Sequence, residues 1–236
     1  MVTPDEALRA AAAVGPYFVW EPWSAGAGWR PLAELTDPAV VAERVAAARG
    51  ALVTMFGLDE DVVPPRVVAS ITFLGLASRL LSPALGAAVL GGVLPAAELW
   101  WKPVAGGPWP IAYRDAVAGD ALLAPVPPVL AAFQERFALS PQVLWGNVAS
   151  ALAGAAGLLP DAERAFAVVA AALAEPPLAG MGSLVQPDPR YARQFLVRRN
   201  CCLYYRIPGG GFCGDCVLTP PAERRRGWAA ALSRQP

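Results

Sequence analysis

The chain has 236 residues, 19 acidic and 19 basic side chains, no histidine, and 56% hydrophobic residues. Without histidine, Ser–His and Cys–His nucleophile pairs and the commonest general base at neutral pH are excluded. The most apolar region, residues 67–97, is split by Arg79, and helix-breaking residues follow at Pro83, Gly86, Gly91, Gly92 and Pro95. A membrane-spanning helix needs about 20 predominantly apolar residues. We therefore expect buried helices and no membrane span.

Helix-start signals recur along the chain, each a capping Thr, Asp or Ser beside a proline, or a proline pair. They predict helices over residues 3–14, 37–56, 64–81, 140–158, 160–174, 188–199 and 221–233, with a short Gly-rich helix from residue 82. Residues 98–114 instead predict two short strands joined by a Gly106-Gly107-Pro108 turn. Residues 20–29 predict an irregular loop covering a pocket. The expected fold is mainly α with a small β-hairpin and a C-terminal cysteine loop.

A Pro-rich stretch over residues 175–189 predicts the boundary between two parts of the chain. Residues 1–175 form a helical body with 10 basic and 16 acidic side chains, whereas residues 176–236 carry 9 basic and 3 acidic ones. The C-terminal part is too small to fold alone without a metal, so we expect it to dock on the body. Its basic charge suits an anionic substrate or an acidic protein partner. We interpret the Arg224-Arg225-Arg226 run as a solvated helix face.

All four cysteines lie near the C-terminus, at Cys201, Cys202, Cys213 and Cys216. The N-terminus is acidic and lacks a secretory signal, which predicts a cytoplasmic protein, and in that reducing compartment clustered cysteines more often bind metal than form disulfides. Four thiolates can hold an iron–sulfur cluster or a tetrahedral zinc ion. Structural zinc usually uses two Cys-x2-to-4-Cys knuckles, but the adjacent pair is not one. This favours iron–sulfur and leaves zinc open.

The spacing also excludes several iron–sulfur patterns. A Rieske centre needs two histidines, and the run fails both the plant-type and the bacterial ferredoxin spacings. Residues 209–214 formally match the dinucleotide fingerprint G-x-G-x-x-G, but that fingerprint must follow a strand and open a helix in a βαβ unit. No nicotinamide or flavin site is otherwise visible. We therefore expect electrons from a separate protein, such as a ferredoxin or a reductase.

The run Arg-Arg-Asn-Cys-Cys-Leu-Tyr-Tyr-Arg-Ile-Pro-Gly-Gly-Gly-Phe-Cys-Gly-Asp-Cys, residues 198–216, resembles the C-terminal signature of the FhuF-type ferric-siderophore reductases. These cytoplasmic proteins bind one [2Fe-2S] cluster through a Cys-Cys-x10-Cys-x2-Cys pattern. The resemblance implies that Cys201, Cys202, Cys213 and Cys216 are the cluster ligands. It also implies a helical body similar to the C-terminal part of siderophore synthetases. Residues 144–150 also resemble family members, but far less specifically than the cysteine run does.

The same resemblance implies a function. The protein would pass one electron from its [2Fe-2S] cluster to Fe(III) held by a siderophore, of hydroxamate type, and release Fe(II). The helical body would offer a siderophore-binding surface, and residues near the cluster would contact the substrate or support the cluster: Arg198, Arg199, Tyr204, Tyr205 and Arg206. The protein would act in the cytoplasm or at the inner face of the membrane, without nucleic acid. The alternative is a zinc- or cluster-stabilised binding or redox-sensing module without reductase activity.

Overall fold

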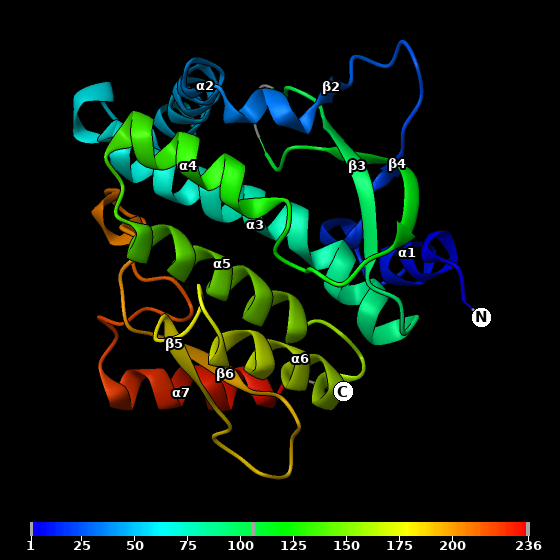
Figure 1. The fold of residues 1–236 in the computed structure, drawn as a ribbon. Coiled ribbons are helices and arrows are strands. Elements are labelled where there is room, and N and C mark those ends of the chain that lie inside the picture. Colours follow the sequence, from blue (N-terminus) through cyan, green and yellow to red (C-terminus); the bar gives the residue numbers. More distant parts are fainter. Residues whose placement is uncertain (1, 105–106, 235–236) are drawn as a thin grey trace.

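The computed structural model describes residues 2–104 and 107–234, of which helices are the main element (Figure 1). The protein is 52% helical, which confirms the mainly α prediction. The described residues form seven α-helices: α1 Pro4–Ala12, α2 Pro38–Phe56, α3 Pro65–Leu90, α4 Val126–Phe137, α5 Pro141–Ala156, α6 Ala162–Ala174 and α7 Pro221–Leu232.

Predicted capping residues begin four of these helices: α1, α2, α5 and, through Asp161, α6. Thr3 forms a capping box with Glu6, the Asp37 side chain accepts from the Ala39 N–H, and the Ser140 side chain accepts from the Val143 N–H. Each satisfies a backbone donor that a helix start leaves free. Helix α4 was not predicted because it begins at a proline-rich segment without a side-chain cap.

Helix α3 is the centre of the fold and packs against α1, α2, α4 and α5. The sequence predicted a break at Ser82-Pro83, and this is wrong: α3 continues through Pro83 to Leu90. Proline lacks the N–H that would bond to the carbonyl of the residue four positions earlier, here Arg79. That carbonyl instead accepts from the Trp20 indole Nε1 at 3.0 Å. A side chain from the N-terminal segment thus satisfies the group that Pro83 leaves free.

Arg79 is a charged side chain buried in the apolar helix α3, and its hydrogen bonds stabilise the charge there. Its guanidinium donates to the carbonyl oxygens of Pro16, Val19 and Trp109, all outside the helix. Among the residues the structure describes, α3 is the one helix long and apolar enough to span a membrane, but 72% of its most apolar window is buried. We conclude that α3 is the core helix of this fold.

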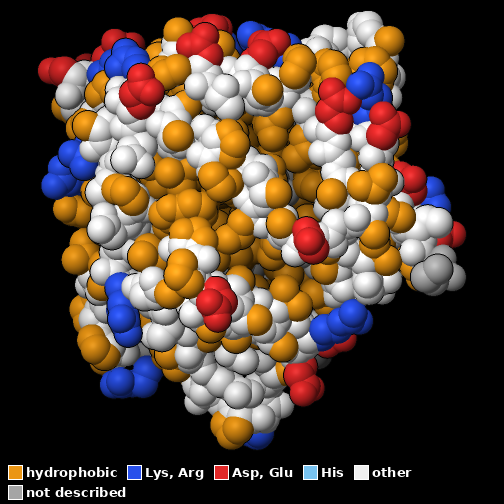
Figure 2. Space-filling view, viewed as in Figure 1, with side chains coloured by type: hydrophobic (Ala, Val, Ile, Leu, Met, Phe, Trp, Pro, Cys, Tyr) orange, Lys and Arg blue, Asp and Glu red, His pale blue; other side chains and the backbone are white. Residues whose placement is uncertain are grey.

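The predicted β-hairpin is present, and it belongs to a larger sheet. Strand β3 (Pro95–Trp101) pairs antiparallel with β4 (Ile111–Ala118), and the predicted turn lies partly outside the described residues. Two short strands from the predicted N-terminal loop complete the order β1-β4-β3-β2, with β1 at Glu21–Pro22 and β2 at Arg30–Pro31. Trp20 lines an apolar cavity of about 450 Å3 between this sheet and α3. Figure 2 shows this recess near the middle of the face that is turned toward the reader.

The segment before the cysteines forms a hairpin, so the predicted helix over residues 188–199 is wrong. Strand β5 (Gly182–Val185) pairs antiparallel with β6 (Phe195–Arg198). The Asp188 side chain accepts from the N–H and guanidinium of Arg190, which makes a local turn instead of capping a helix. Leu196 and Arg198 alternate with less buried neighbours, as a strand with one packed face requires. The cysteine loop therefore lies between a strand and α7.

Candidate metal centre

The four cysteines lie in the loop that connects β6 to α7, at the lower left of Figure 1. All four are free thiols. Cys202 and Cys216 are 1% and 3% exposed, whereas Cys201 and Cys213 are half-buried. The inner pair is thus shielded from water, and the outer pair forms the accessible side of the site.

A tight turn follows the adjacent pair Cys201-Cys202. Leu203 has a φ of 70°, in the left-handed region that non-glycine residues rarely adopt, and a short 3-10 helix, η4 (Tyr204–Arg206), comes next. The turn directs the Leu203 N–H to the Cys201 sulfur at 3.3 Å. The Leu218 N–H likewise donates to the Cys216 sulfur at 3.4 Å. Such bonds stabilise thiolates and tune the potentials of iron–sulfur centres.

The two halves of the loop meet at Cys202 and Cys213, whose sulfur atoms are 3.5 Å apart. A thiol–thiolate hydrogen bond across this contact lowers the pKa of Cys202 to about 6, and it raises the pKa of Cys213. Burial raises the pKa of Cys201. The N–H of Tyr204 and the cation of Arg198 further lower the Cys202 pKa. Cys202 is therefore held ready as a thiolate, the form that binds metal.

These residues fit a [2Fe-2S] cluster better than a single zinc ion. The adjacent pair Cys201-Cys202 is not one of the Cys-x2-to-4-Cys knuckles that structural zinc sites usually use. A structural zinc site would gather four thiolates about 2.3 Å from one point. A two-iron cluster instead takes two thiolates on each iron, so it can be bound by sulfurs that are more widely spread. An all-sulfur donor set with N–H donors aimed at two of the sulfurs suits that cluster.

A buried polar network joins the cysteine loop to the helical body. The Ser70 hydroxyl on α3 donates to the Cys202 carbonyl at 2.8 Å. The Asn147 amide on α5 donates to the Ser70 carbonyl at 2.8 Å and to its hydroxyl at 3.1 Å. The Asn147 Oδ1 accepts from the Arg198 guanidinium at 2.7 Å. These bonds fix the position of Cys202 against the two central helices.

Arg198 lies in a buried, supporting position beside the cysteine loop. Its side chain is 1% exposed, and it also donates to Asn200 Oδ1 at 3.0 Å. Because its cation lowers the pKa of Cys201 and Cys202, it offsets negative charge at the thiolates.

The other four predicted contact residues remain near the surface. Arg199, Tyr205 and Arg206 are exposed, and Tyr204 is half-buried. The Arg206 Nε donates to the Tyr205 hydroxyl at 3.2 Å, and the guanidinium lies 5.8 Å from that ring. None of these residues lines the cavity of about 500 Å3 that Cys213 borders. A substrate contact by any of them stays a prediction.

The sequence interpretation missed three residues of this region. Arg224 is not part of a solvated helix face: its guanidinium turns back to the carbonyls of Cys216, at 3.1 Å, and Thr219, at 2.9 Å. Only Arg225 and Arg226 of that run are exposed. Ser70 and Asn147 were also missed, although a lone asparagine in the apolar run 144–156 is a usable signal, because a buried amide needs partners.

Gly146 leaves room for the cysteine loop to approach α5. A Cβ at this position would overlap the Asn200 side chain, which accepts from Arg198. We expect Gly146→Ala to displace Asn200 and to lower the free energy of unfolding by about 1–2 kcal/mol, despite the better helix propensity of alanine. Thermal unfolding measures this loss.

Gly154→Ala is the matched control, since it lies in the same helix with open space at its Cβ. We expect it to be neutral or stabilising by up to about 1 kcal/mol. Adding Asn200→Ala to Gly146→Ala removes the overlap and should recover part of the loss. Equal stabilisation by both glycine substitutions would contradict a tight contact at Gly146.

Comparison with known proteins agrees with the chemistry of this loop. Residues 198–218 match the family model FhuF 2Fe-2S C-terminal domain. No curated protein matches the chain significantly. The matched segment contains all four cysteines, and the cofactor of this domain is a [2Fe-2S] cluster. The C-terminal segment of the chain is therefore similar to the 2Fe-2S domain of the FhuF-type proteins.

Proposed function

We propose that the protein is a ferric-siderophore reductase, with Cys201, Cys202, Cys213 and Cys216 as the cluster ligands. The observation that carries this proposal is the all-thiolate site, which is matched by the FhuF 2Fe-2S domain and has two buried and two accessible sulfurs. That domain family is associated with ferric siderophore reduction. When bound, the cluster supplies a one-electron carrier.

The protein's own residues prepare the site for this task. The Leu203 and Leu218 N–H groups and the Arg198 cation stabilise negative charge at the sulfurs. Burial of Cys202 and Cys216 excludes water from one side. One electron converts siderophore-bound Fe(III) to Fe(II), and hard oxygen donors hold Fe(II) far less tightly. No covalent bond within the siderophore has to be broken.

We further propose that a separate acidic protein, a ferredoxin or reductase, supplies the electron in the cytoplasm. Exposed arginines beside the site, Arg199 and Arg206, suit such a partner.

The test is anaerobic reoxidation of the dithionite-reduced protein by ferric desferrioxamine B, followed in the visible spectrum with a ferrous chelator to trap Fe(II). We expect one Fe(II) for each electron stored. The gallium(III) complex is the matched control, since it has the same charge and cannot accept an electron. A colourless protein with one zinc per chain would support the zinc alternative. A coloured protein that stays reduced in the presence of ferric complexes would leave the cluster without this activity.

A further inference from the structure

We propose that the exposed face of the cysteine loop is the docking surface of the electron donor, and that this donor is an acidic protein which covers an apolar patch and pairs with the arginines around it. This inference deepens the proposed function and rests on it. The patch consists of Tyr205, Phe212, Val217 and Leu218, which are 40%, 50%, 37% and 47% exposed. We call these four side chains the loop patch.

The loop patch concentrates apolar surface beside the metal centre. Eleven large hydrophobic side chains are exposed among the described residues, and four of the eleven lie within residues 205–218. Single exposed apolar side chains are ordinary, but a group of them marks an interaction site. Phe212 directly precedes Cys213, and the Leu218 N–H donates to the Cys216 sulfur at 3.4 Å. A partner that covers the loop patch would therefore lie against the cysteines.

Arginines without a carboxylate partner surround the loop patch. Arg199 and Arg206 are exposed in the cysteine loop, and Arg225 and Arg226 are exposed on α7, which follows it. Within the described part of the chain, none of these four forms an ion pair. The arginines that do form one lie outside the loop: Arg30, Arg44, Arg49, Arg114 and Arg190. The cations around the loop patch are therefore free to pair with a partner.

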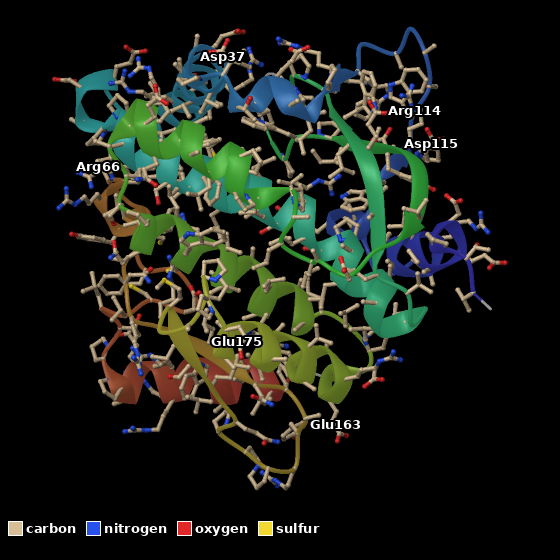
Figure 3. The ribbon with its side chains drawn as sticks, viewed as in Figure 1. Asp37, Arg66, Arg114, Asp115, Glu163 and Glu175 are labelled. Atoms are coloured by element: carbon tan, nitrogen blue, oxygen red, sulfur yellow. The ribbon has the colours of Figure 1, made fainter. Side chains whose placement is uncertain are left out.

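Arg66 adds a fifth cation, from the helical body. It precedes Ser70 by about one helical turn, so both lie on the same side of α3. The Ser70 hydroxyl donates to the Cys202 carbonyl, and α3 also contacts the short helix η4 in the cysteine loop. Arg66 is exposed, and Figure 3 shows it at the edge of the molecule where α3 begins. The basic surface thus extends from the cysteine loop onto the body.

An apolar centre ringed by cations fits an acidic protein that has an apolar contact of its own. Anionic lipid would offer the same charge, but it supplies no electron and would cover the half-buried Cys201 and Cys213. A protein donor gains from the same position, because electron transfer slows steeply with distance. Weak electron-transfer complexes bury less than about 1,200 Å2 in total, an area that suits four apolar side chains and a ring of arginines.

The test measures how fast an acidic [2Fe-2S] ferredoxin reduces the oxidised holoprotein in anaerobic stopped flow. NADPH and ferredoxin–NADP+ reductase keep the ferredoxin reduced, and a mixture without ferredoxin gives the background rate. One electron leaves the ferredoxin and enters the protein, and no bond forms or breaks. We expect Phe212→Ser and Val217→Ser each to lower the second-order rate constant about fivefold to tenfold, because they remove apolar surface from the loop patch.

A charge reversal tests the basic surface separately. We expect Arg66→Glu to lower the same rate constant about fivefold at low salt and by much less at about 0.5 M salt, where exposed charges are screened. The losses in Phe212→Ser and Val217→Ser should persist at high salt, because apolar contacts are not screened. This difference in salt dependence distinguishes the apolar centre from the ring of cations.

Each variant has a matched control. Val117→Ser is the control for Val217→Ser, because Val117 is 60% exposed on β4, outside the cysteine loop. Arg9→Glu is the control for Arg66→Glu: Arg9 is also exposed, and its helix α1 lies on the opposite side of the molecule from the start of α3 (Figure 1). Both controls should react as the unmodified protein does. All variants should retain about two irons per chain and be fully reduced by dithionite.

The outcomes separate this inference from the proposed function. If Phe212→Ser, Val217→Ser and Arg66→Glu react as fast as the unmodified protein, or if the ferredoxin reduces the unmodified protein no faster than the background, the docking inference is overturned. It is also overturned if these variants lose binding to vesicles of phosphatidylglycerol and phosphatidylcholine while their reaction with ferredoxin is unchanged, since the surface would then face a membrane. If the rates follow the expected order but the reduced protein does not reduce ferric desferrioxamine B, the docking surface is supported and the reductase proposal fails.

Discussion

Cys202→Ser is expected to yield a protein without its visible chromophore and with iron reduced from about two atoms per chain to about none. The reason is chemical, since a serine hydroxyl is a poor ligand for iron in a cluster that selects soft thiolates. Cys202 is also only 1% exposed. In its hydrogen-bonded pair with Cys213, Cys202 is the residue whose pKa is lowered, so its thiolate is the favoured one. Iron analysis, the visible spectrum and electron paramagnetic resonance of the reduced protein measure the loss.

The Cys202→Ser test needs proof that the body still folds. The hydrogen bond from Ser70 reaches the backbone carbonyl of residue 202, so it can persist in the variant. We expect the helical signal in circular dichroism to stay close to that of the unmodified protein. Ser183→Ala, at an exposed position on β5, is the control and should retain full iron. Full iron and an unchanged spectrum in Cys202→Ser would remove Cys202 from the proposed ligand set.

Local signals predicted the parts of the fold that local interactions determine. Thr3, Asp37 and Ser140 cap helices as their types and neighbours indicate. The failures at Pro83 and Asp188 have tertiary causes. The free carbonyl before Pro83 is satisfied by Trp20, which is distant in sequence. At Asp188 the side chain bonds to Arg190, and the following residues pair with β5. Neither partner could be identified from the local pattern.

The residues of the metal centre likewise fall into two groups: those that the sequence could predict and those that it could not. The cysteine spacing was visible in the sequence because all four residues lie in one loop, and the family comparison agrees with the predicted cofactor. The residues that position the loop come from α3 and α5, far away in the chain, so spacing could not associate Ser70 and Asn147 with Cys202. The run of three arginines was misread for a related reason, because only Arg224 reaches backbone carbonyls at the end of the cysteine loop.

The second large effect is expected at Asn147, which is completely buried. Asn147→Leu has a similar volume but deprives the Arg198 guanidinium of its 2.7 Å acceptor and leaves Ser70 without its amide donor. A hydrogen bond to a charged group contributes about 1.5–3 kcal/mol, and a buried group left unpaired adds to the cost. We expect a loss of about 3 kcal/mol, or about 6–12 °C in Tm for a chain of this length. Thermal and urea unfolding of the holoprotein measure it.

The double variant separates stability from charge at the metal centre. Arg198→Met combined with Asn147→Leu leaves neither an unpaired cation nor an unpaired amide, so it should be more stable than the sum of the single losses predicts. The reduction potential should follow a different order. It should fall in Arg198→Met and in the double variant, because a buried cation near the thiolates favours the electron-richer state, and change less in Asn147→Leu, which keeps the cation.

Arg114→Met is the control for both measurements, because Arg114 lies on β4 at the far side of the molecule from the cysteine loop and is partly exposed (Figure 3). It should leave the potential unchanged and cost no more than about 1 kcal/mol. Equal potentials in Arg198→Met and the unmodified protein would show that Arg198 serves only the packing of the loop. Strictly additive losses would show that Asn147 and Arg198 act independently. The predicted combination, recovered stability with a lowered potential, requires one residue pair both to anchor the loop and to set its charge.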